Sequence, residues 1–177
     1  MSHFIFVRHG QSKANANTEI ADSHSPLTEN GIEQARRTGK EVKDLGISLI
    51  LCSPFLRAQQ TAETIAGEIG LDITQIKIVD DLRERGLGVL EGRHRDHDGL
   101  WYFTDETSEN VESREELLRR MKECLEVIEQ YSKTNTVLVS GHSISGFYLQ
   151  QAAKKRKLKD FDPPELMSNA DFVNVEF

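Results

Sequence analysis

The chain has 177 residues, of which 37% are hydrophobic, and shows no low-complexity tract or repeat, so we expect a single domain spanning residues 1–177. Its 29 acidic and 22 basic side chains give a formal charge of −7, which argues against nucleic acid or an anionic membrane as a partner. No apolar run reaches transmembrane length, and His3 and Arg8 come too early for a signal peptide, so the expected location is cytoplasmic.

Five short runs rich in β-branched and apolar residues are typical of buried strands. These runs occupy residues 4–7, 47–51, 76–79, 136–139 and 172–177. Helical patterns fill most of the gaps between them. Strands that alternate with helices predict a mainly parallel sheet covered by helices on both faces, with right-handed crossovers.

The first two long helices are predicted from apolar periodicity and from their end signals. Residues 28–45 form an amphipathic pattern that stops at Gly46, and a second pattern begins at Ser53 and Pro54 as N-cap and first-turn proline and runs to Gly70. The expected inner faces carry Ile32, Ala35, Val42 and Leu45 in the first helix, and Ala58, Ala62, Ile65 and Ile69 in the second.

A capping box formed by Ser113 and Glu116 predicts the start of a third helix, whose apolar stripe ends near Tyr131. The segment before it, residues 87–110, fits neither the helical nor the strand period. It is rich in Gly, Asp and His around the only tryptophan, Trp101. We predict a long loop or lid near the functional site.

Polar side chains follow four of the predicted strands, where open α/β sheets bind their ligands. The strand exits carry Arg8, His9 and Gly10, then Ser53 and Arg57, then Arg83 and Glu84, and finally Gly141, His142 and Ser143. Each of these side chains alone is usually a surface or turn residue. Their joint placement at one edge of the sheet indicates a site.

The chemistry that this set favours is phosphoryl transfer. The guanidinium groups of Arg8 and Arg57 match phosphate oxygens, and helices starting after Gly10 and Ser143 are expected to offer backbone amides to an anion. A neutral imidazole can attack phosphorus to give a phosphohistidine. From the residues alone, either histidine at the strand exits can be that nucleophile.

A proton must also reach the leaving oxygen, and a water molecule must lose one in the second step. A single carboxyl group can serve both steps, and Glu84 is the candidate. The other histidine, if protonated, would join the arginines in stabilising the transferring group. The scheme requires no metal and no cofactor.

Several separated blocks in this order resemble the histidine phosphatase superfamily, the phosphoglycerate-mutase-like group. The blocks cover nearly the whole chain: FIFVRHGQSKAN, SPLTENGIEQA, CSPFLRAQQTAET, LRERGLGVLEG, ESREELLRRM, VLVSGHSISG and NADFVNVEF. The resemblance implies a three-layer α/β/α fold with one antiparallel edge strand, which we place at residues 172–177. It also implies residue roles, with His9 as the phosphorylated nucleophile, Glu84 as proton donor, and Arg8, Asn15, Arg57 and His142 as phosphate contacts.

Phosphatases and cofactor-dependent phosphoglycerate mutases of this group share the same centre. The mutases typically carry Glu-Arg-His-Tyr-Gly at the proton donor, whereas this chain has ERGLG at residues 84–88. It also lacks a glycine between Asn17 and Leu27, and its insertion after the donor is short. These departures favour a phosphatase acting on a small phosphorylated metabolite or a phosphoprotein, with the mutase as the alternative.

Residues 93–97 add a cluster of possible cations, Arg93, His94, Arg95 and His97. The cluster could meet a second anionic group on the substrate, and a solvated loop is an equally weighted alternative. The pattern His94-x-x-His97 is a weak metal motif, because no second ligand block stands at a recognisable spacing. Cys52 and Cys124 also lack metal-type spacing and are expected to be buried, reduced thiols.

Two rival functions remain. VLVSGHSISG comes close to the nucleophile elbow of a serine hydrolase, but Ser145 stands where glycine is needed and no histidine follows His142, which argues against an esterase using Ser143. A non-catalytic phosphoester-binding module would use the same pocket without turnover. Only the joint presence of His9 and Glu84 speaks against that module.

Overall fold

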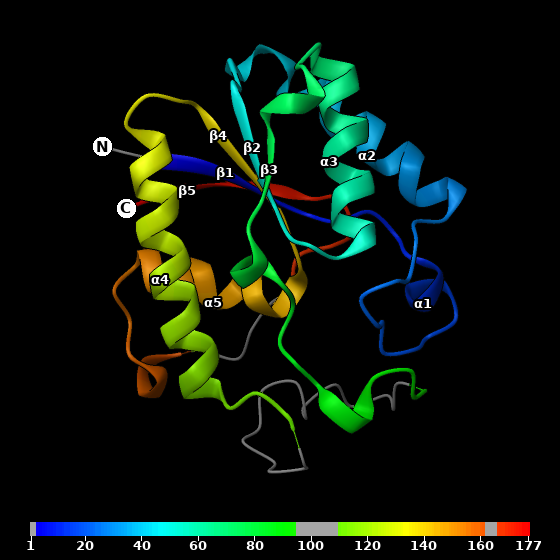
Figure 1. Cartoon of the computed structure of the whole chain (residues 1–177), viewed down its shortest axis with the longest axis vertical. Helices are drawn as coiled ribbons and strands as arrows, with labels where there is room; N and C mark the ends of the chain where they lie inside the picture. Colours follow the sequence, from blue (N-terminus) through cyan, green and yellow to red (C-terminus); the bar gives the residue numbers. More distant parts are fainter. Residues whose placement is uncertain (1–2, 95–109, 162–165) are drawn as a thin grey trace.

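The computed structural model describes residues 3–94, 110–161 and 166–177. These residues build a five-stranded sheet in the order β3-β2-β4-β1-β5, flanked by helices (Figure 1). The strands are β1 (His3–Arg8), β2 (Leu49–Cys52), β3 (Ile76–Ile78), β4 (Val137–Gly141) and β5 (Phe172–Glu176). All pairs are parallel except β1 with β5, so the predicted antiparallel edge strand is confirmed at the C-terminal segment.

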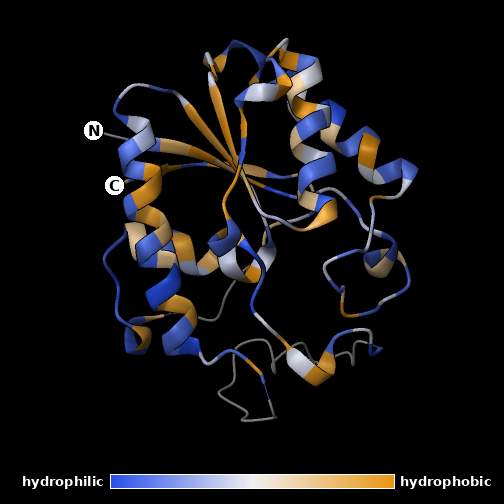
Figure 2. Ribbon diagram, viewed as in Figure 1, coloured by the Kyte–Doolittle hydropathy of each residue, from blue (hydrophilic) through white to orange (hydrophobic). Residues whose placement is uncertain are grey.

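Two pairs of long helices cover the sheet, α2 (Glu29–Val42) with α3 (Leu56–Ile69) on one face and α4 (Arg114–Ser132) with α5 (Ser143–Ala153) on the other (Figure 1). Successive strand residues point to opposite faces, so Phe4 and Phe6 pack toward α4 and α5 while Ile5 and Val7 pack toward α2 and α3. Figure 2 shows the apolar strands between two layers of mixed helices. The three-layer prediction is confirmed.

The remaining helical segments are short. They are α1 (Lys13–Ala16), η1 (Lys43–Leu45), η2 (Ile73–Gln75), η3 (Asp80–Leu82), η4 (Gly88–Leu90) and η6 (Leu158–Asp160). Within the described ranges, no helix combines the length and apolarity needed to cross a bilayer. Of the predicted loop or lid at 87–110, the structure describes 87–94 and 110, and residues 95–109, including Trp101, lie outside the described residues.

Two burial predictions are wrong for geometric reasons. Ile78 in β3 is 49% exposed, because β3 is an edge strand that pairs only with β2. Leu45 is 42% exposed, because the chain tightens into η1 after Val42, and the 3₁₀ turn moves Leu45 off the buried face of α2. The predicted stop is confirmed, with Gly46 in the left-handed conformation at φ 69°.

The predicted start of α3 is also wrong, whereas that of α4 is confirmed. The N-cap of α3 is Phe55, and the Ser53 hydroxyl accepts a hydrogen bond from the Phe55 N–H at 3.2 Å instead of capping the helix directly. Ser113 and Glu116 form the complete capping box of α4. Ser53 therefore lies before the helix, in the segment that follows β2.

Strand register brings the polar exits together. Arg8 at the end of β1 lies opposite Gly141 at the end of β4, and Cys52 at the end of β2 lies opposite Ser140. The His9 N–H donates to the Gly141 carbonyl at 3.0 Å. The residues that follow β1, β2 and β4 therefore meet at one edge of the sheet.

The loop after β1 is held against the start of α2 by two glycines. A Cβ atom on Gly31 would lie 2.1 Å from the Gln11 carbonyl oxygen, and one on Gly10 would lie 2.3 Å from the Gly31 carbonyl oxygen. Both contacts are with backbone, which cannot move aside as a flexible side chain can. The close approach of these two segments therefore requires glycine at both positions.

We expect Gly31→Ala to lower the free energy of unfolding by about 1–3 kcal/mol, because the added methyl group overlaps the Gln11 backbone. The matched control is Gly67→Ala in α3, where nothing lies within 4 Å of the added Cβ. That change should raise stability by about 0.5–1 kcal/mol through helix propensity. Urea unfolding of both variants checks the pair, and a stabilised Gly31→Ala would contradict the close contact.

Candidate active site

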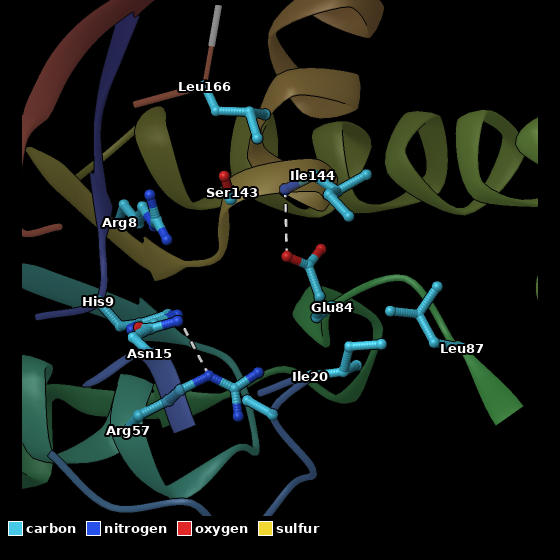
Figure 3. A pocket seen from close by; sticks show the side chains of 11 residues that line it. Arg8, His9, Asn15, Ile20, Arg57, Glu84, Leu87, Ser143, Ile144 and Leu166 are labelled. Carbon is cyan, nitrogen blue, oxygen red and sulfur yellow. Dashed lines mark hydrogen bonds between the residues drawn. The ribbon is translucent and has the colours of Figure 1, made fainter. Parts of the chain in front are cut away.

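A cavity of about 110 Å³ opens at the carboxyl end of the sheet (Figure 3). Its polar walls come from distant parts of the chain and include five of the predicted site residues: Arg8, His9, Asn15, Arg57 and Glu84. Its apolar walls include Ile20, Leu87, Ile144 and Leu166. Arg8, His9, Arg57 and Glu84, predicted from the strand exits, and Asn15, implied by the resemblance, therefore surround one small cavity.

His9 is held in one tautomer by two contacts. Its Nδ1 lies 2.7 Å from the Gly10 carbonyl oxygen, which can only accept, so Nδ1 carries the proton. Arg57 Nε donates to His9 Nε2 at 3.2 Å, so Nε2 presents a lone pair (Figure 3). Burial, followed by the charges of Arg57 and Arg8, holds the pKa of His9 well below its usual value. The imidazole is therefore neutral, with its Nε2 lone pair at the cavity wall.

Arg57 is 2% exposed and fixed from several sides. Its Nη1 donates to the Asp22 carbonyl oxygen at 2.6 Å, and its guanidinium lies 5.1 Å from the centre of the Phe55 ring. Burial lowers the pKa of Arg57 to about 10, which leaves it charged at neutral pH. A fixed cation therefore stands beside His9.

The segment before β5 contacts residues of the cavity wall, and the sequence analysis did not predict these contacts. Arg8 Nη1 donates to the Met167 carbonyl oxygen, and Asn169 Nδ2 donates to the His9 carbonyl oxygen at 3.1 Å and to Asn15 Oδ1 at 3.3 Å. The block NADFVNVEF contains Asn169, but it was used only as part of the family likeness. No local pattern indicates which distant carbonyl an asparagine binds.

Asn15 belongs to a capping box at the start of α1. Its backbone N–H donates to Ser12 Oγ, and its Oδ1 accepts from the Ser12 N–H, each at 3.2 Å. Oδ1 also accepts from Asn169. The group that Asn15 can offer an anion is therefore its Nδ2 amide.

The prediction that amides after Gly10 serve an anion is wrong. The Gly10 N–H donates to Thr61 Oγ1 at 3.1 Å, and the Gln11 N–H donates to Gln34 Oε1 at 2.8 Å. At the start of the following helix, the Lys13 N–H donates to the Pro26 carbonyl oxygen at 2.9 Å and the Ala14 N–H to Ser25 Oγ at 3.1 Å. All of these amides are therefore paired with oxygens of the chain itself. The helix that follows, α1, has only four residues.

The start of α5 does hold an anion, and that anion is Glu84. Its Oε2 accepts from the Ile144 N–H at 3.1 Å (Figure 3), and its Oε1 accepts from the Ser145 N–H at 2.7 Å. The positive end of the α5 dipole suits a carboxylate. These two amides are therefore occupied by the protein itself, which corrects the expectation that they bind substrate.

The loop that carries Glu84 is clamped by Arg120 of α4, which is 5% exposed. Arg120 Nη1 donates to the Asp81 carbonyl at 2.5 Å and to the Arg83 carbonyl at 2.9 Å, and Nη2 reaches the Glu84 carbonyl at 3.3 Å. Glu112 forms an ion pair with Arg120 at 2.6 Å. Arg120 and Glu112 lie in the block ESREELLRRM, which the sequence analysis used only for a helix start and for the family resemblance, so this clamp was missed.

His142, the N-cap of α5, is fully buried beside His9, with 5.2 Å between the ring centres. Burial, followed by the charges of Arg57, His9, Arg8 and Arg120, holds the pKa of His142 well below its usual value. The neutral form is therefore favoured, contrary to the idea of a protonated second histidine. His142 lies next to the cavity without lining it.

The basic cluster after the donor block does not line the cavity where the structure describes it. The Arg93 carbonyl accepts from the Ile20 N–H at 2.8 Å, and His94 forms an isolated bridge with Glu19. The side chains of Arg93 and His94 are exposed, and Arg95 and His97 lie outside the described residues. Within the described ranges, no group of three His, Cys, Asp or Glu side chains could hold a metal ion.

The surroundings of the two cysteines and of Ser143 do not suit a nucleophile. Cys52 and Cys124 are both buried, as predicted, and burial raises the pKa of each thiol to about 12. The Ser143 hydroxyl is buried and has no hydrogen-bond partner in the part of the chain that the structure describes. A serine needs an adjacent base to become nucleophilic, and His142 Nε2 contacts Ser53 instead.

The fold and the site define an α/β protein with a small cationic pocket around a neutral histidine. A sequence model of the histidine phosphatase superfamily (branch 1) matches residues 4–177, and the chain belongs to that superfamily. The solved structure of a mycobacterial glucosyl-3-phosphoglycerate phosphatase with VO3 is similar, with a TM-score of 0.84 at 22% identity over 98% of this chain and 90% of that chain. This likeness shows the fold.

Relatives by sequence carry both phosphatase and mutase names. The "Uncharacterized phosphatase PhoE" of Bacillus subtilis (strain 168) is 33% identical over 189 residues, which is 100% of this chain and 89% of that protein. A "Probable phosphoglycerate mutase GpmB" of Enterobacter sp. (strain 638) is 45% identical over 98 residues, which is 54% of this chain and 44% of that protein. The latter match therefore spans less than half of the mutase-named protein.

The lowered pKa values of His9 and His142 predict a loss of stability in mild acid. The unfolded chain takes up these protons near the ordinary pKa of 6.5 while the folded protein does not, so below that pH the unfolded state binds more protons. The free energy of unfolding should fall by up to about 1.4 kcal/mol per pH unit for each histidine between about pH 6.5 and 5.5.

Urea unfolding at several pH values measures this slope. His142→Gln should remove about half of it, because one of the two buried imidazoles is gone. His24→Gln is the matched control, since His24 is exposed and outside the site. A wild-type stability that stays constant over this interval would contradict the neutral state of the two buried histidines.

Proposed function

We propose that the chain is a phosphomonoesterase that works through a covalent phosphohistidine on His9, with Glu84 as general acid and base. The observation that carries the proposal is the tautomer of His9. The Gly10 carbonyl oxygen accepts a hydrogen bond from the Nδ1–H, which leaves the Nε2 lone pair at the wall of a cavity flanked by Arg8 and Arg57. A lone pair between two cations is suited to attack an anionic phosphoryl group.

In the first step the phosphoryl group sits between Arg8 and Arg57, whose guanidinium groups bind its oxygens, with Asn15 Nδ2 as a further donor. Arg57 Nε releases His9 Nε2, which attacks phosphorus. A nitrogen–phosphorus bond forms, the ester oxygen–phosphorus bond breaks, and the leaving oxygen takes a proton from the carboxylic acid form of Glu84.

In the second step a water molecule attacks the phosphohistidine. The Glu84 carboxylate takes its proton, an oxygen–phosphorus bond forms, and the nitrogen–phosphorus bond breaks with its electron pair returning to His9 Nε2. Glu84 can stay on the start of α5 throughout. Oε1 accepts two amide hydrogens, from Ser145 and Arg85, and Oε2 accepts one, from Ile144. A carboxylate has about four acceptor sites, so one site on Oε2 remains for the moving proton.

The phosphatase activity is favoured over the mutase by the periphery of the site. The ERGLG sequence at residues 84–88 lacks the His-Tyr pair of the mutases. The cavity of about 110 Å³ has room for a phosphoryl group, which both activities require. A relative that matches over the whole chain, from Bacillus subtilis (strain 168), is named as a phosphatase. We propose a small phosphorylated metabolite as substrate, the class that the mycobacterial phosphatase's name suggests for that protein.

Reaction with a phosphodonor should place phosphate on His9. We expect mass spectrometry under alkaline conditions, where phosphohistidine is stable, to find the label on His9 in the wild type and nowhere in His9→Ala. His24→Ala, which changes an exposed histidine, should keep the label. Label on another residue, or equal labelling of His9→Ala, would refute the mechanism.

Product analysis separates the three candidate functions. A phosphatase releases inorganic phosphate from phosphomonoesters, and a mutase interconverts phosphoglycerates after priming by a bisphosphoglycerate. A binding module retains phosphate but turns over none of a broad set of phosphomonoesters. Only the first result agrees with the proposal.

Glu84→Gln tests the proton transfer. For alkyl phosphates, whose leaving oxygen needs a proton, we expect a rate loss of about 100-fold or more. For activated aryl phosphates, whose leaving group departs unprotonated, the loss of rate in the first step should be much smaller. Glu63→Gln, on the exposed side of α3, is the matched control and should change neither rate. Equal losses for both substrate types would exclude Glu84 as the acid.

A further inference from the structure

The junction of β4 and α5 contains an unusual set of buried polar atoms. His142 Nε2 lies 2.7 Å from Ser53 Oγ, and the same Oγ accepts a hydrogen bond from the Phe55 N–H at 3.2 Å. His142 Nδ1 is buried and has no hydrogen-bond partner among the described residues. One imidazole nitrogen is therefore paired and the other is left unsatisfied in the resting protein.

The two neutral tautomers of His142 differ in how many groups they leave unpaired. If Nε2 carried the proton, it would donate to Ser53 Oγ, and both the Ser53 hydroxyl hydrogen and the Nδ1 lone pair would lack a partner within the described ranges. If Nδ1 carries the proton, the Ser53 hydroxyl donates to Nε2 and only the Nδ1–H is unpaired. Because unsatisfied buried groups are costly, the second tautomer is favoured.

We propose that Ser53 is a positioning residue that holds His142 in the Nδ1–H tautomer, so that neutral His142 donates a hydrogen bond to an oxygen of the phosphoryl group bound beside His9. The proposal rests on the proposed function for its last step, and the tautomer itself is a property of the resting protein. An unpaired buried donor, in a ring 5.2 Å from that of His9, is satisfied when an anion enters.

Ser53 is held where this task requires. It is fully buried, and its backbone N–H donates at 3.0 Å to the carbonyl oxygen of Ser140, which lies two residues before His142 in the sequence. The Phe55 N–H occupies one lone pair of its hydroxyl, which orients the hydrogen toward His142. The Phe55 ring packs against the imidazole with 5.2 Å between the centres. Backbone and ring contacts thus fix both partners of the hydrogen bond.

A neutral donor is also what the surroundings of His142 allow. The groups that act on it are Arg57 from α3, Arg8 and His9 from the β1 exit, and Arg120 from α4, and all three arginines disfavour an imidazolium. Donation from a neutral Nδ1–H needs no proton uptake on substrate binding. The phosphoryl group then gains a donor without a further buried charge.

The first experiment determines the tautomer in the resting, full-length protein. Protein labelled with ¹⁵N at histidine is studied by long-range ¹H–¹⁵N correlation, and the His142 signals are identified by their loss in His142→Asn. We expect Nδ1 at the shift of a protonated nitrogen and Nε2 at that of an unprotonated one. A wild-type spectrum with the proton on Nε2 overturns the proposal, whether or not any Ser53 variant folds.

The second experiment measures binding of inorganic phosphate near neutral pH. Ser53→Ala should weaken binding roughly tenfold, the loss expected when one buried donor is no longer aligned, and its His142 signals should shift toward a mixture of tautomers. Ser53→Thr keeps the hydroxyl and should restore both the tautomer and most of the affinity. The control is Ser48→Ala, at an exposed serine before β2, which should change neither.

The outcomes separate the two proposals. Wild-type phosphate affinity in folded Ser53→Ala would overturn the positioning role. If His142 has the expected tautomer and Ser53→Ala weakens phosphate binding, but no phosphomonoester is turned over, the positioning role stands and the phosphatase activity fails. Circular dichroism of each variant tests whether the fold is retained.

Discussion

The site depends on the parallel pairing of β1 with β4, in which Arg8 lies opposite Gly141. This register brings the His9 ring against that of His142. The Phe6 ring packs directly against the backbone of Gly141 and Gly146, since an added Cβ at these glycines would lie 2.9 Å and 2.2 Å from the ring. This close packing in the core stabilises the register. A shift of one residue would turn every β1 side chain to the opposite face and separate the two histidines.

The cations near the site have two effects that belong together. The protein as a whole is acidic, yet Arg8, Arg57 and Arg120 gather around the histidines. Burial is the main reason that the imidazoles stay unprotonated, and the positive field that suits a phosphoryl group adds to it. Only an unprotonated imidazole can act as a nucleophile. Glu84, seated on the start of α5, places one carboxylate within this field without filling the cavity.

The sequence predicted what local patterns and strand order determine. Periodicity located the strands and the helices α2, α3 and α4, and a capping box gave the start of α4. The strand-exit rule predicted that His9, Arg57 and Glu84 lie together, and all three line the cavity. Contacts that depend on tertiary geometry could not be found in this way. Examples are the hydrogen bonds from Arg120 to the carbonyls of Asp81, Arg83 and Glu84, and the Thr61 hydroxyl oxygen that accepts the Gly10 amide hydrogen.

His9 and His142 show why residue type alone does not assign a role at such a site. His9 faces a carbonyl oxygen, which can only accept, so its other nitrogen presents a lone pair. His142 faces the Ser53 hydroxyl, which can donate, so in the tautomer we propose its other nitrogen presents a hydrogen. One ring is then fitted to attack phosphorus and the other to bind a phosphoryl oxygen. The partners, Gly10 and Ser53, distinguish two chemically identical side chains whose ring centres are 5.2 Å apart.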